Sequence, residues 1–493
     1  MKQPGWGDAV GNDTKVIFDK AFKAHQRGDL TDAVTGYNRL LEIDPNNFQV
    51  KSLKGAVMLQ ANLIQDGVKL LAECVKENDR DPTVLSNLGF GLLQLGKPEL
   101  GLKYARMAHD LNPSGAEILA TMAKCLLELG EFQEAITQAH KALEMQPANP
   151  SARHSLIFAQ AMTIGVTETL DQVRRAEGGL ASIADDTKLS LIPELAKDEK
   201  HEEILELLET FESDGHLVWN LHKLKALLAL QRTDEAVTIG GIVLTQKDQL
   251  ALERATDFQS DHPRRILNNK NLIPAHRRVI AFSLWGDNSK YTHNAVLNAK
   301  LMHKIYPDWT ARFYVDNTVP EPIIKAIRDY GAQVQLVAPD NREYLKLFWR
   351  FLAHDDKTID LFMCRDCDAV ISEREAVAVR DWLNSDCSFH IMRDHPEHAE
   401  LIMAGMWGGI TNYLSPLMDL AVDYYERHSN KWRWVDQDFL RDIVWPAIKG
   451  DCLTHDTYFQ FGVNASKFPD NAPFDPNNHV GGYNPTEWRV TEQ

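Results

Sequence analysis

The sequence lacks the features that mark several large classes of protein. No apolar run approaches the roughly 18 residues of a membrane-spanning helix. Residues 1–7 contain no apolar core of signal-peptide length. The formal net charge is −17, and this acidic excess argues against DNA or RNA as the main partner, because nucleic-acid-binding proteins carry a basic surface. We therefore expect a cytoplasmic protein without a membrane span.

Cysteine is also sparse, with six residues scattered over a chain of 493. This usage suits a reducing compartment better than a disulfide framework. Cys364 and Cys367 lie three residues apart, but a zinc site would need a second pair at suitable spacing, and the sequence has none. We interpret the two as small core or site-wall residues, with a redox pair as the alternative.

The first 150 residues repeat with a period of 34. A turn residue recurs at Gly28, Asn62, Gly96 and Gly130. Small residues precede the turn at Ala21, Gly55, Gly89 and Ala123, and follow it at Ala33, Gly67, Gly101 and Ala135. The units close at Pro45, Asp79, Pro113 and Pro147. Small residues let two antiparallel helices approach closely, and proline ends the second helix because it has no N–H to donate.

This pattern resembles the tetratricopeptide repeat (TPR), which implies an α-solenoid of four units over residues 14–150. Beyond it the pattern decays, and residues 151–256 are expected to form degenerate helical repeats that cap the array. Residues 257–276 are polar and are interpreted as a linker. Because repeat arrays usually recognise other molecules, we expect this half to recruit a protein or glycan partner, with homo-oligomerisation as the alternative role.

Residues 277–493 alternate short apolar runs with helical patterns. Strands are expected over 279–285, 311–315, 334–337 and 359–364, and helices over 291–306, 321–330 and 344–352. The alternation predicts an α/β domain with a mostly parallel sheet and helices on both faces. Ligands of such sheets bind beyond the carboxyl ends of the strands. Ser283, Trp285 and residues 366–368 all lie at expected strand ends, and so could share one crevice.

The motif Arg365-Asp366-Cys367-Asp368 follows the fourth expected strand. Two aspartates in this spacing can converge on one hard cation if the backbone turns there. Aspartate oxygens suit Mg²⁺ or Mn²⁺, which usually keep positions open for water and substrate phosphates. The motif alone is weak evidence, because Asp-x-Asp is frequent and often only stabilises a turn.

Several segments around this motif resemble one family. They are residues 282–288 with Tyr291, 306–309, 348–352, 390–396, 404–408 and 436–440. Together they are similar to GT-A-type glycosyltransferases that use nucleotide sugars, especially bacterial capsule and polysaccharide enzymes that carry tetratricopeptide repeats. The resemblance implies a Rossmann-like GT-A fold over residues 277–493. It also implies a hexosyltransferase that moves a sugar from a nucleotide donor, with UDP-sugar favoured, to a protein or glycan acceptor. Cys367 departs from the pattern, since relatives commonly have serine there.

The resemblance assigns a Mn²⁺ or Mg²⁺ ion to Asp366 and Asp368, with His455 preferred over His479 as a late third ligand. The ion would neutralise the diphosphate as it leaves. The resemblance and the local pattern place the donor against Ser283, Trp285, Tyr291, Arg350, Arg365, Asp366, Arg393, Asp394, His395 and Trp407. Arg350 has an equally weighted alternative as a surface residue paired with Asp355 or Asp356. Arg365 has one as a neighbour that lowers the pKa of the carboxylates.

Asp436 and Asp438 are the candidate catalytic residues. In an inverting reaction one of them would be the general base that deprotonates the acceptor hydroxyl. In a retaining reaction they would position the acceptor or contact the donor hydroxyls. The alternative is that they cap the start of the following helix.

Two other functions compete with glycosyl transfer. The first is a repeat scaffold whose C-terminal domain binds a sugar nucleotide without turnover. The second is a nucleotidyltransferase or phosphosugar hydrolase, since these enzymes also use carboxylate-bound Mg²⁺. The second lacks support, because the sequence has neither a P-loop nor the nucleophile elbow of serine hydrolases.

Overall fold

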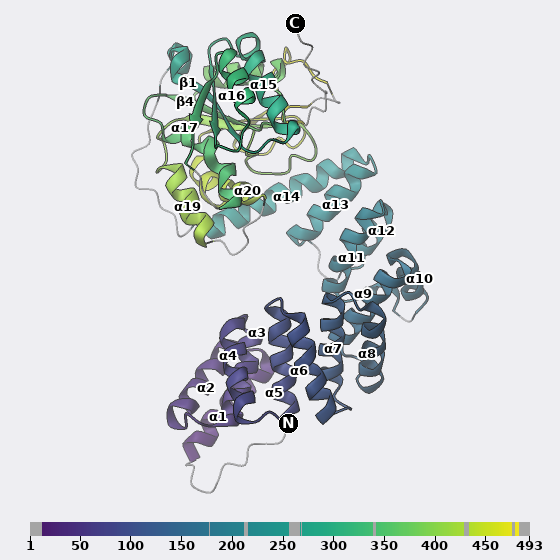
Figure 1. Ribbon diagram of the computed structural model, residues 1–493. Coiled ribbons are helices and arrows are strands. Elements are labelled where there is room, and N and C mark those ends of the chain that lie inside the picture. The colour runs from purple at the N-terminus through teal and green to yellow at the C-terminus, as the bar shows by residue number, and fades with distance from the viewer. Residues whose placement is uncertain are drawn as a thin grey trace. The chain divides into compact units, whose positions relative to one another are not determined.

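The computed structural model describes residues 12–176, 178–211, 215–255, 267, 269–338, 342–427, 433–475 and 479–482 (Figure 1). The chain divides into two compact units, Met1–Glu212 and Ser213–Gln493. Most of the linker expected over residues 257–276 lies outside the described residues. Within the described ranges, no helix has both the length and the apolar character that crossing a membrane requires.

The first unit is built from helices arranged largely in antiparallel pairs (Figure 1). The four predicted repeats are the pairs α1 (Asn12–Arg27) and α2 (Leu30–Ile43), α3 (Phe48–Gln60) and α4 (Ile64–Glu77), α5 (Pro82–Gln94) and α6 (Pro98–Leu111), and α7 (Ala116–Glu128) and α8 (Phe132–Met145). They are followed by α9 (Pro150–Ile164), α10 (Val166–Arg175), α11 (Asp185–Lys197) and α12 (His201–Glu209). The 34-residue period therefore predicted the helix pairs correctly.

The turns between paired helices explain the residues that recur there. Gly28, Gly96 and Gly130 have φ values of 82°, 70° and 73°, and Asn62 has 61°. This left-handed conformation costs glycine nothing, and asparagine tolerates it better than most residues. Asn62 therefore meets the same backbone requirement as the three glycines.

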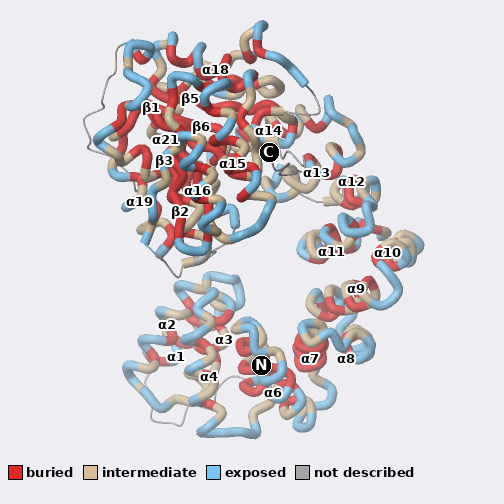
Figure 2. Tube along the Cα trace, turned by 45° about the horizontal axis from the view of Figure 1, so that its top comes forward, coloured by how far each residue is buried: buried red, intermediate tan, exposed pale blue. Residues whose placement is uncertain are grey.

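Small residues let the paired helices touch. A Cβ built on Gly89 of α5 would lie 2.8 Å from the carbonyl oxygen of Gly101 on α6, and a Cβ on Gly101 would lie equally close to that of Gly89. In Figure 2, buried, intermediate and exposed residues alternate along the helices of the array.

Helices α13 (Leu217–Ala229) and α14 (Thr233–Arg254) belong to the second unit, although the sequence analysis grouped them with the degenerate repeats. The buried Lys247 ammonium donates to the carbonyl of Ala399 at 2.9 Å. Asp248 accepts from the indole N–H of Trp445 at 2.7 Å. These contacts pair residues far apart in the sequence, so helical periodicity gives no sign of them.

The second unit contains an eight-stranded mixed sheet in the order β3-β2-β1-β4-β6-β5-β7-β8. Its strands are β1 (Arg278–Leu284), β2 (Thr310–Val315), β3 (Gln333–Leu336), β4 (Leu361–Arg365), β5 (Phe389–Arg393), β6 (Trp407–Ile410), β7 (Cys452–Asp456) and β8 (Asn464–Ser466). β1 pairs in parallel with β2 and β4, whereas β6 is antiparallel to both β4 and β5. The first four strands match the sequence prediction to within a few residues.

Helices cover both faces of this sheet. Alternate residues of β1 point to opposite faces, so Ile280 and Phe282 join one core cluster while Val279 and Ala281 join the other. The first cluster is covered by α15 (Ser289–Ile305), α16 (Glu321–Asp329) and α18 (Glu373–Asn384). The second is covered by α14, η5 (Glu343–Phe351), α17 (Leu352–Asp355), α19 (Leu417–Arg427), α20 (Val435–Phe439), η6 (Leu440–Val444) and α21 (Trp445–Ile448). The helix expected over residues 344–352 is a 3₁₀-helix, which brings its aromatic residues against β1.

Candidate functional site at the carboxyl ends of β1 and β4

A pocket of about 500 Å³ lies where β1 and β4 end. The two strands are parallel neighbours, so their carboxyl ends meet at the same edge of the sheet. The 3₁₀-helix η5 and the start of α20 add side chains from the covering layer. The predicted site residues that line it are Ser283, Trp285, Tyr291, Arg350, Asp366, Asp368 and Asp436.

Arg350 joins two of the carboxylates. Its guanidinium contacts Asp366 and pairs with Asp436 at 2.7 Å between Nη2 and Oδ2. Its backbone N–H donates to the Ser283 hydroxyl at 2.9 Å, which ties η5 to the end of β1. The alternative pairing with Asp355 or Asp356 is therefore wrong. Those two carboxylates accept from the backbone of α19 and from Arg312.

Asp436 has an unusual environment for a carboxyl group. Burial raises its pKa, the Arg350 guanidinium opposes this rise, and the neighbouring charge of Asp366 adds to it, so that the pKa of Asp436 is about 6. A carboxyl group that changes protonation state near neutral pH, inside a pocket, is a candidate for proton transfer.

Asp366 and Asp368 remain partly accessible in this pocket, with side-chain exposures of 45% and 32%. Asp368 also pairs with the Lys290 ammonium at 3.1 Å. Gly405 packs against Asp366, and a Cβ at that position would collide with the carboxylate. Cys367 is buried beside the carbonyl of Ser283, so it is a wall residue, as one of the two interpretations of the cysteine pair predicted.

The two accessible carboxylates fit a hard divalent cation. Mg²⁺ and Mn²⁺ are commonly held by one or two carboxylates, with substrate phosphates and water completing the shell. Across the described part of the chain, no three histidine, cysteine or acidic side chains gather as a ready-made metal site. A cation at this site would therefore take its remaining ligands from substrate and solvent.

His455 lies away from this pocket. Its Nδ1 is 2.8 Å from Nε2 of His390, and its Nε2 is 3.1 Å from an oxygen of Asp381. With both ring nitrogens engaged, His455 has no free atom for a cation in this arrangement. The other late histidine, His479, stacks on His395 with ring centroids 4.4 Å apart. Neither His479 nor His395 lines the pocket.

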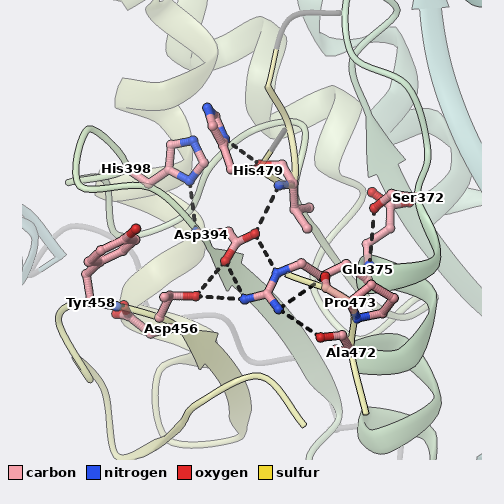
Figure 3. A network of polar contacts seen from close by, with 12 residues as sticks. Ser372, Glu375, Asp394, His398, Asp456, Tyr458, Ala472, Pro473 and His479 are labelled. Carbon is pink, nitrogen blue, oxygen red and sulfur yellow. Dashed lines mark hydrogen bonds and ion pairs between the residues drawn. The ribbon is translucent and has the colours of Figure 1, made fainter. Parts of the chain in front are cut away.

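Arg393 and Asp394 lie in buried networks at the ends of β5 and β7. Asp394 accepts two hydrogen bonds of 2.8 Å from the Arg374 guanidinium and one of 3.1 Å from the backbone N–H of Val480 (Figure 3). Arg393 pairs with Asp456 at 3.1 Å, and the side chains of both are fully buried. These groups satisfy one another, so in this arrangement they hold the loops together and do not face the pocket.

Three more predicted site residues are engaged elsewhere. Arg365 pairs with the buried Glu375 at 3.3 Å. Trp407 is a core residue with no exposed surface, packed edge-on against Phe362. Asp438 pairs with Arg441 at 2.7 Å.

The pocket also contains residues that the sequence analysis did not single out, namely Tyr344, Arg433, Trp434 and Gln437. Trp434 is 46% exposed, and the Arg433 guanidinium lies 4.7 Å from its ring centre. A tryptophan two residues before Asp436 was the signal available in the sequence. Residues 428–432 beside it lie outside the described residues.

Comparison with known proteins finds similarity over part of the chain. No family model matches the sequence. Subunit CDC16 of the anaphase-promoting complex of Saccharomyces cerevisiae is 28% identical over 137 residues, covering 26% of this chain and 16% of that protein. Hsp70-Hsp90 organizing protein 2 of Arabidopsis thaliana is 26% identical over 136 residues, covering 28% of this chain and 22% of that protein. The chain thus spans about a fifth of the length of these curated relatives.

Solved structures give a similar result. A tetratricopeptide repeat protein from Parabacteroides merdae is 15% identical, with a TM-score of 0.37, and covers 47% of this chain and 91% of its own. The MamA protein is 21% identical, with a TM-score of 0.28, and covers 33% of this chain and 88% of its own. The N-terminal unit is a tetratricopeptide-type repeat array, and a unit with a mixed α/β sheet follows it.

Proposed function

We propose that this chain is an interaction protein whose repeat array binds a partner protein and whose sheet unit binds a nucleotide sugar through a divalent cation. The observation that carries the second part is the pocket, where Asp366, Asp368 and Arg350 converge beside aromatic side chains. The first part is supported by the repeats and by the relatives, one a subunit of a complex and the other an organizing protein.

The pocket offers each part of a nucleotide sugar a chemical counterpart. Asp366 and Asp368 would hold Mn²⁺ or Mg²⁺ against the diphosphate. Arg350 lies between the carboxylates of Asp366 and Asp436, as a charged donor for phosphate oxygens. Trp285 and Tyr291 offer flat faces on which a base or a sugar ring can stack.

Glycosyl transfer is the second candidate function, and the environment of Asp436 favours it. With a pKa of about 6, this carboxyl group is mostly ionised at neutral pH. It is joined through Arg350 to Asp366, and so lies where an acceptor hydroxyl could lose its proton. The mostly parallel sheet, with Asp366 and Asp368 directly after β4, also supports this candidate. A UDP-sugar is the favoured donor.

A donor screen tests both candidates. The purified chain is incubated with Mn²⁺ or Mg²⁺ and a panel of UDP-, GDP- and CMP-sugars, and thermal shift and nucleotide release are measured together. We expect cation-dependent stabilisation by one class of nucleotide. Release of the nucleotide would support transfer, whereas stabilisation without release would support binding alone.

Matched variants make the screen specific to the pocket. Asp368→Asn removes one charged ligand and should abolish the cation-dependent shift. Asp419→Asn makes the same change on the exposed surface of α19 and should leave it intact. The proposal fails if the folded protein shows no cation-dependent shift with any donor.

A further inference from the structure

The first helix pair of the repeat array carries a second cavity, of about 490 Å³, between α1 and α2. Ala21, Ala24 and Gly36 contribute small residues to its lining, and four basic residues also line it, namely Lys20, Lys23, Arg27 and Arg39. We call this surface the α1–α2 end face. The proposed function does not specify which surface of the array binds a partner.

Later repeats show what such a face normally contacts. Val16 lines the cavity and is 50% exposed, whereas the residues one, two and three periods later, Val50, Val84 and Ile118, are 0%, 1% and 5% exposed. The same residue position is thus buried in every later repeat of the four. Val50, for example, joins one apolar cluster with Tyr37 and Leu40 on α2 of the preceding repeat.

The contacts of one further position identify the covering element. Lys23 of the first repeat occupies the same repeat position as Gly91 of the third and Cys125 of the fourth. A Cβ on Gly91 would lie 2.7 Å from the Val68 side chain on α4, and a Cβ on Gly101 of α6 would lie 3.1 Å from the sulfur of Cys125. In each case the neighbour is the second helix of the preceding repeat. The α1–α2 end face therefore has the shape of a binding surface for one amphipathic helix.

The charge of the face indicates what kind of helix it would accept. In the described ranges, Lys20, Lys23 and Arg39 form no ion pair, while Arg27 pairs with Asp29 at 2.9 Å. Asp32 also lines the cavity, but the basic residues outnumber it. Such a cluster stands out in a chain whose net charge is −17, and it is complementary to an acidic partner.

We propose that the α1–α2 end face binds an acidic amphipathic helix of a partner protein, seated as the second helix of a preceding repeat would be. The apolar side of the helix would contact Val16 and Ile17, while its acidic residues would pair with Lys20, Lys23 and Arg39. This proposal rests on the first part of the proposed function, since it names the surface of the repeat array and the kind of partner, and it does not depend on the pocket of the sheet unit.

A designed peptide can test helix binding to the α1–α2 end face directly. α4 occupies the equivalent position before α5 and α6, so the probe is a fluorescent Ile64–Glu77 peptide carrying Lys69→Glu and Lys76→Glu. Its binding to the full chain is followed by anisotropy at low and high salt. We expect binding that weakens at least about tenfold when Lys20→Glu and Lys23→Glu are combined, and that weakens with added salt.

A matched double variant controls for net charge. Lys15→Glu with Lys141→Glu changes the same charge at exposed helical positions outside the cavity lining, and should bind like the wild type. Circular dichroism and thermal unfolding check that both variants fold.

Three results would overturn the proposal. The first is no binding by the wild type, which would identify the face as a polar cap that only keeps the array soluble. The second is binding that both double variants retain equally. The third is that the protein does not bind the peptide but does bind phosphatidylserine vesicles, and that this binding depends on Lys20 and Lys23. That result would identify a membrane-binding surface instead.

Discussion

The repeat unit and the sheet unit position their side chains by different means. In the repeats, one set of contacts recurs every 34 residues, so each small residue or turn residue has a counterpart in the next unit. In the sheet unit, the pocket collects Ser283, Arg350, Asp366 and Asp436 from four separate elements. A periodic sequence therefore determines local packing many times over, whereas the pocket depends on a single arrangement of the whole sheet.

The two units also differ in how they use charge. The Arg106–Glu134 pair between repeats is about half exposed on both sides. In the sheet unit, the Arg393–Asp456 pair is fully buried and the Arg374–Asp394 pair nearly so. Exposed pairs contribute little to stability, whereas a buried charge left without its partner is strongly destabilising. Substitutions should therefore have smaller effects in the repeats unless they disturb the helix contacts.

The largest effect is expected from the carboxylates of the pocket. Asp366→Asn or Asp368→Asn should weaken cation-dependent nucleotide-sugar binding by about 100-fold or more, roughly 2.7 kcal/mol, because each removes a charged cation ligand. Isothermal titration with and without Mn²⁺ measures this. The repeat unit should unfold at an unchanged temperature in both variants. A shift in that transition would contradict the independence of the two units.

Glycine-to-alanine changes compare helix packing in the two units. Gly89→Ala places a Cβ 2.8 Å from the Gly101 carbonyl oxygen, and the overpacking should destabilise the repeats by about 1–3 kcal/mol. Gly241→Ala lies in α14 with no heavy atom within 4 Å of the added Cβ, and should stabilise that helix by up to about 1 kcal/mol. Urea unfolding measures both. Equal effects at the two positions would show that helix propensity, and not close approach, controls the repeats.

The pH dependence of stability compares a buried histidine in each unit. Burial lowers the pKa of His398 well below its usual value, and neighbouring His479, His395 and Arg393 lower it further. As pH falls below about 6.5, the unfolded chain binds a proton that the folded sheet unit does not. Stability is therefore lost by roughly 1.4 kcal/mol for each pH unit until the folded pKa is reached.

The His398→Asn variant should reduce this loss, because its amide oxygen can still accept from the Asp394 N–H as His398 Nδ1 does. The matched change His25→Asn in the half-buried site of α1 should alter the pH dependence less. Thermal unfolding at pH 7 and pH 5 measures both. Identical slopes for the wild type and His398→Asn would show that this histidine does not control acid stability.

The smallest effect is expected from the exposed pair between repeats. Arg106→Ala removes an ion pair of 3.1 Å to Glu134, and should change the stability of the repeat unit by less than about 1 kcal/mol. Urea unfolding at low and high salt measures it, with the wild type as the reference. A loss above that size would mean that exposed charges, as well as packing, hold neighbouring repeats together.

Local pattern predicted the repeat pairs and the first four strands, because helix and strand periods are properties of short segments. It also placed Ser283, Trp285, Asp366 and Asp368 near one another, since parallel strands end at one edge of a sheet. The carboxylates at the ends of expected elements were thus predictable, as were the aromatic residues beside them.

Other assignments depended on contacts that no short segment contains. His455 stands in a sequence pattern like that of a late metal ligand, yet His390 and Asp381 engage both its nitrogens. Arg393 was expected at the donor, but a fully buried pair with Asp456 holds it. In both cases the partner lies more than 60 residues away, and only the folded sheet brings the two together.

By itself, the sequence determined the helix pairs, their turns and the strand that ends in Asp366 and Asp368, because these follow from backbone preference and hydrophobic period. The tertiary structure alone decided which polar residues face the pocket and which satisfy one another inside the sheet unit. It also decided that α13 and α14 belong to the sheet unit. The physical reason is that a polar side chain is fixed by the partners that bury it, and those partners are chosen only when distant segments meet.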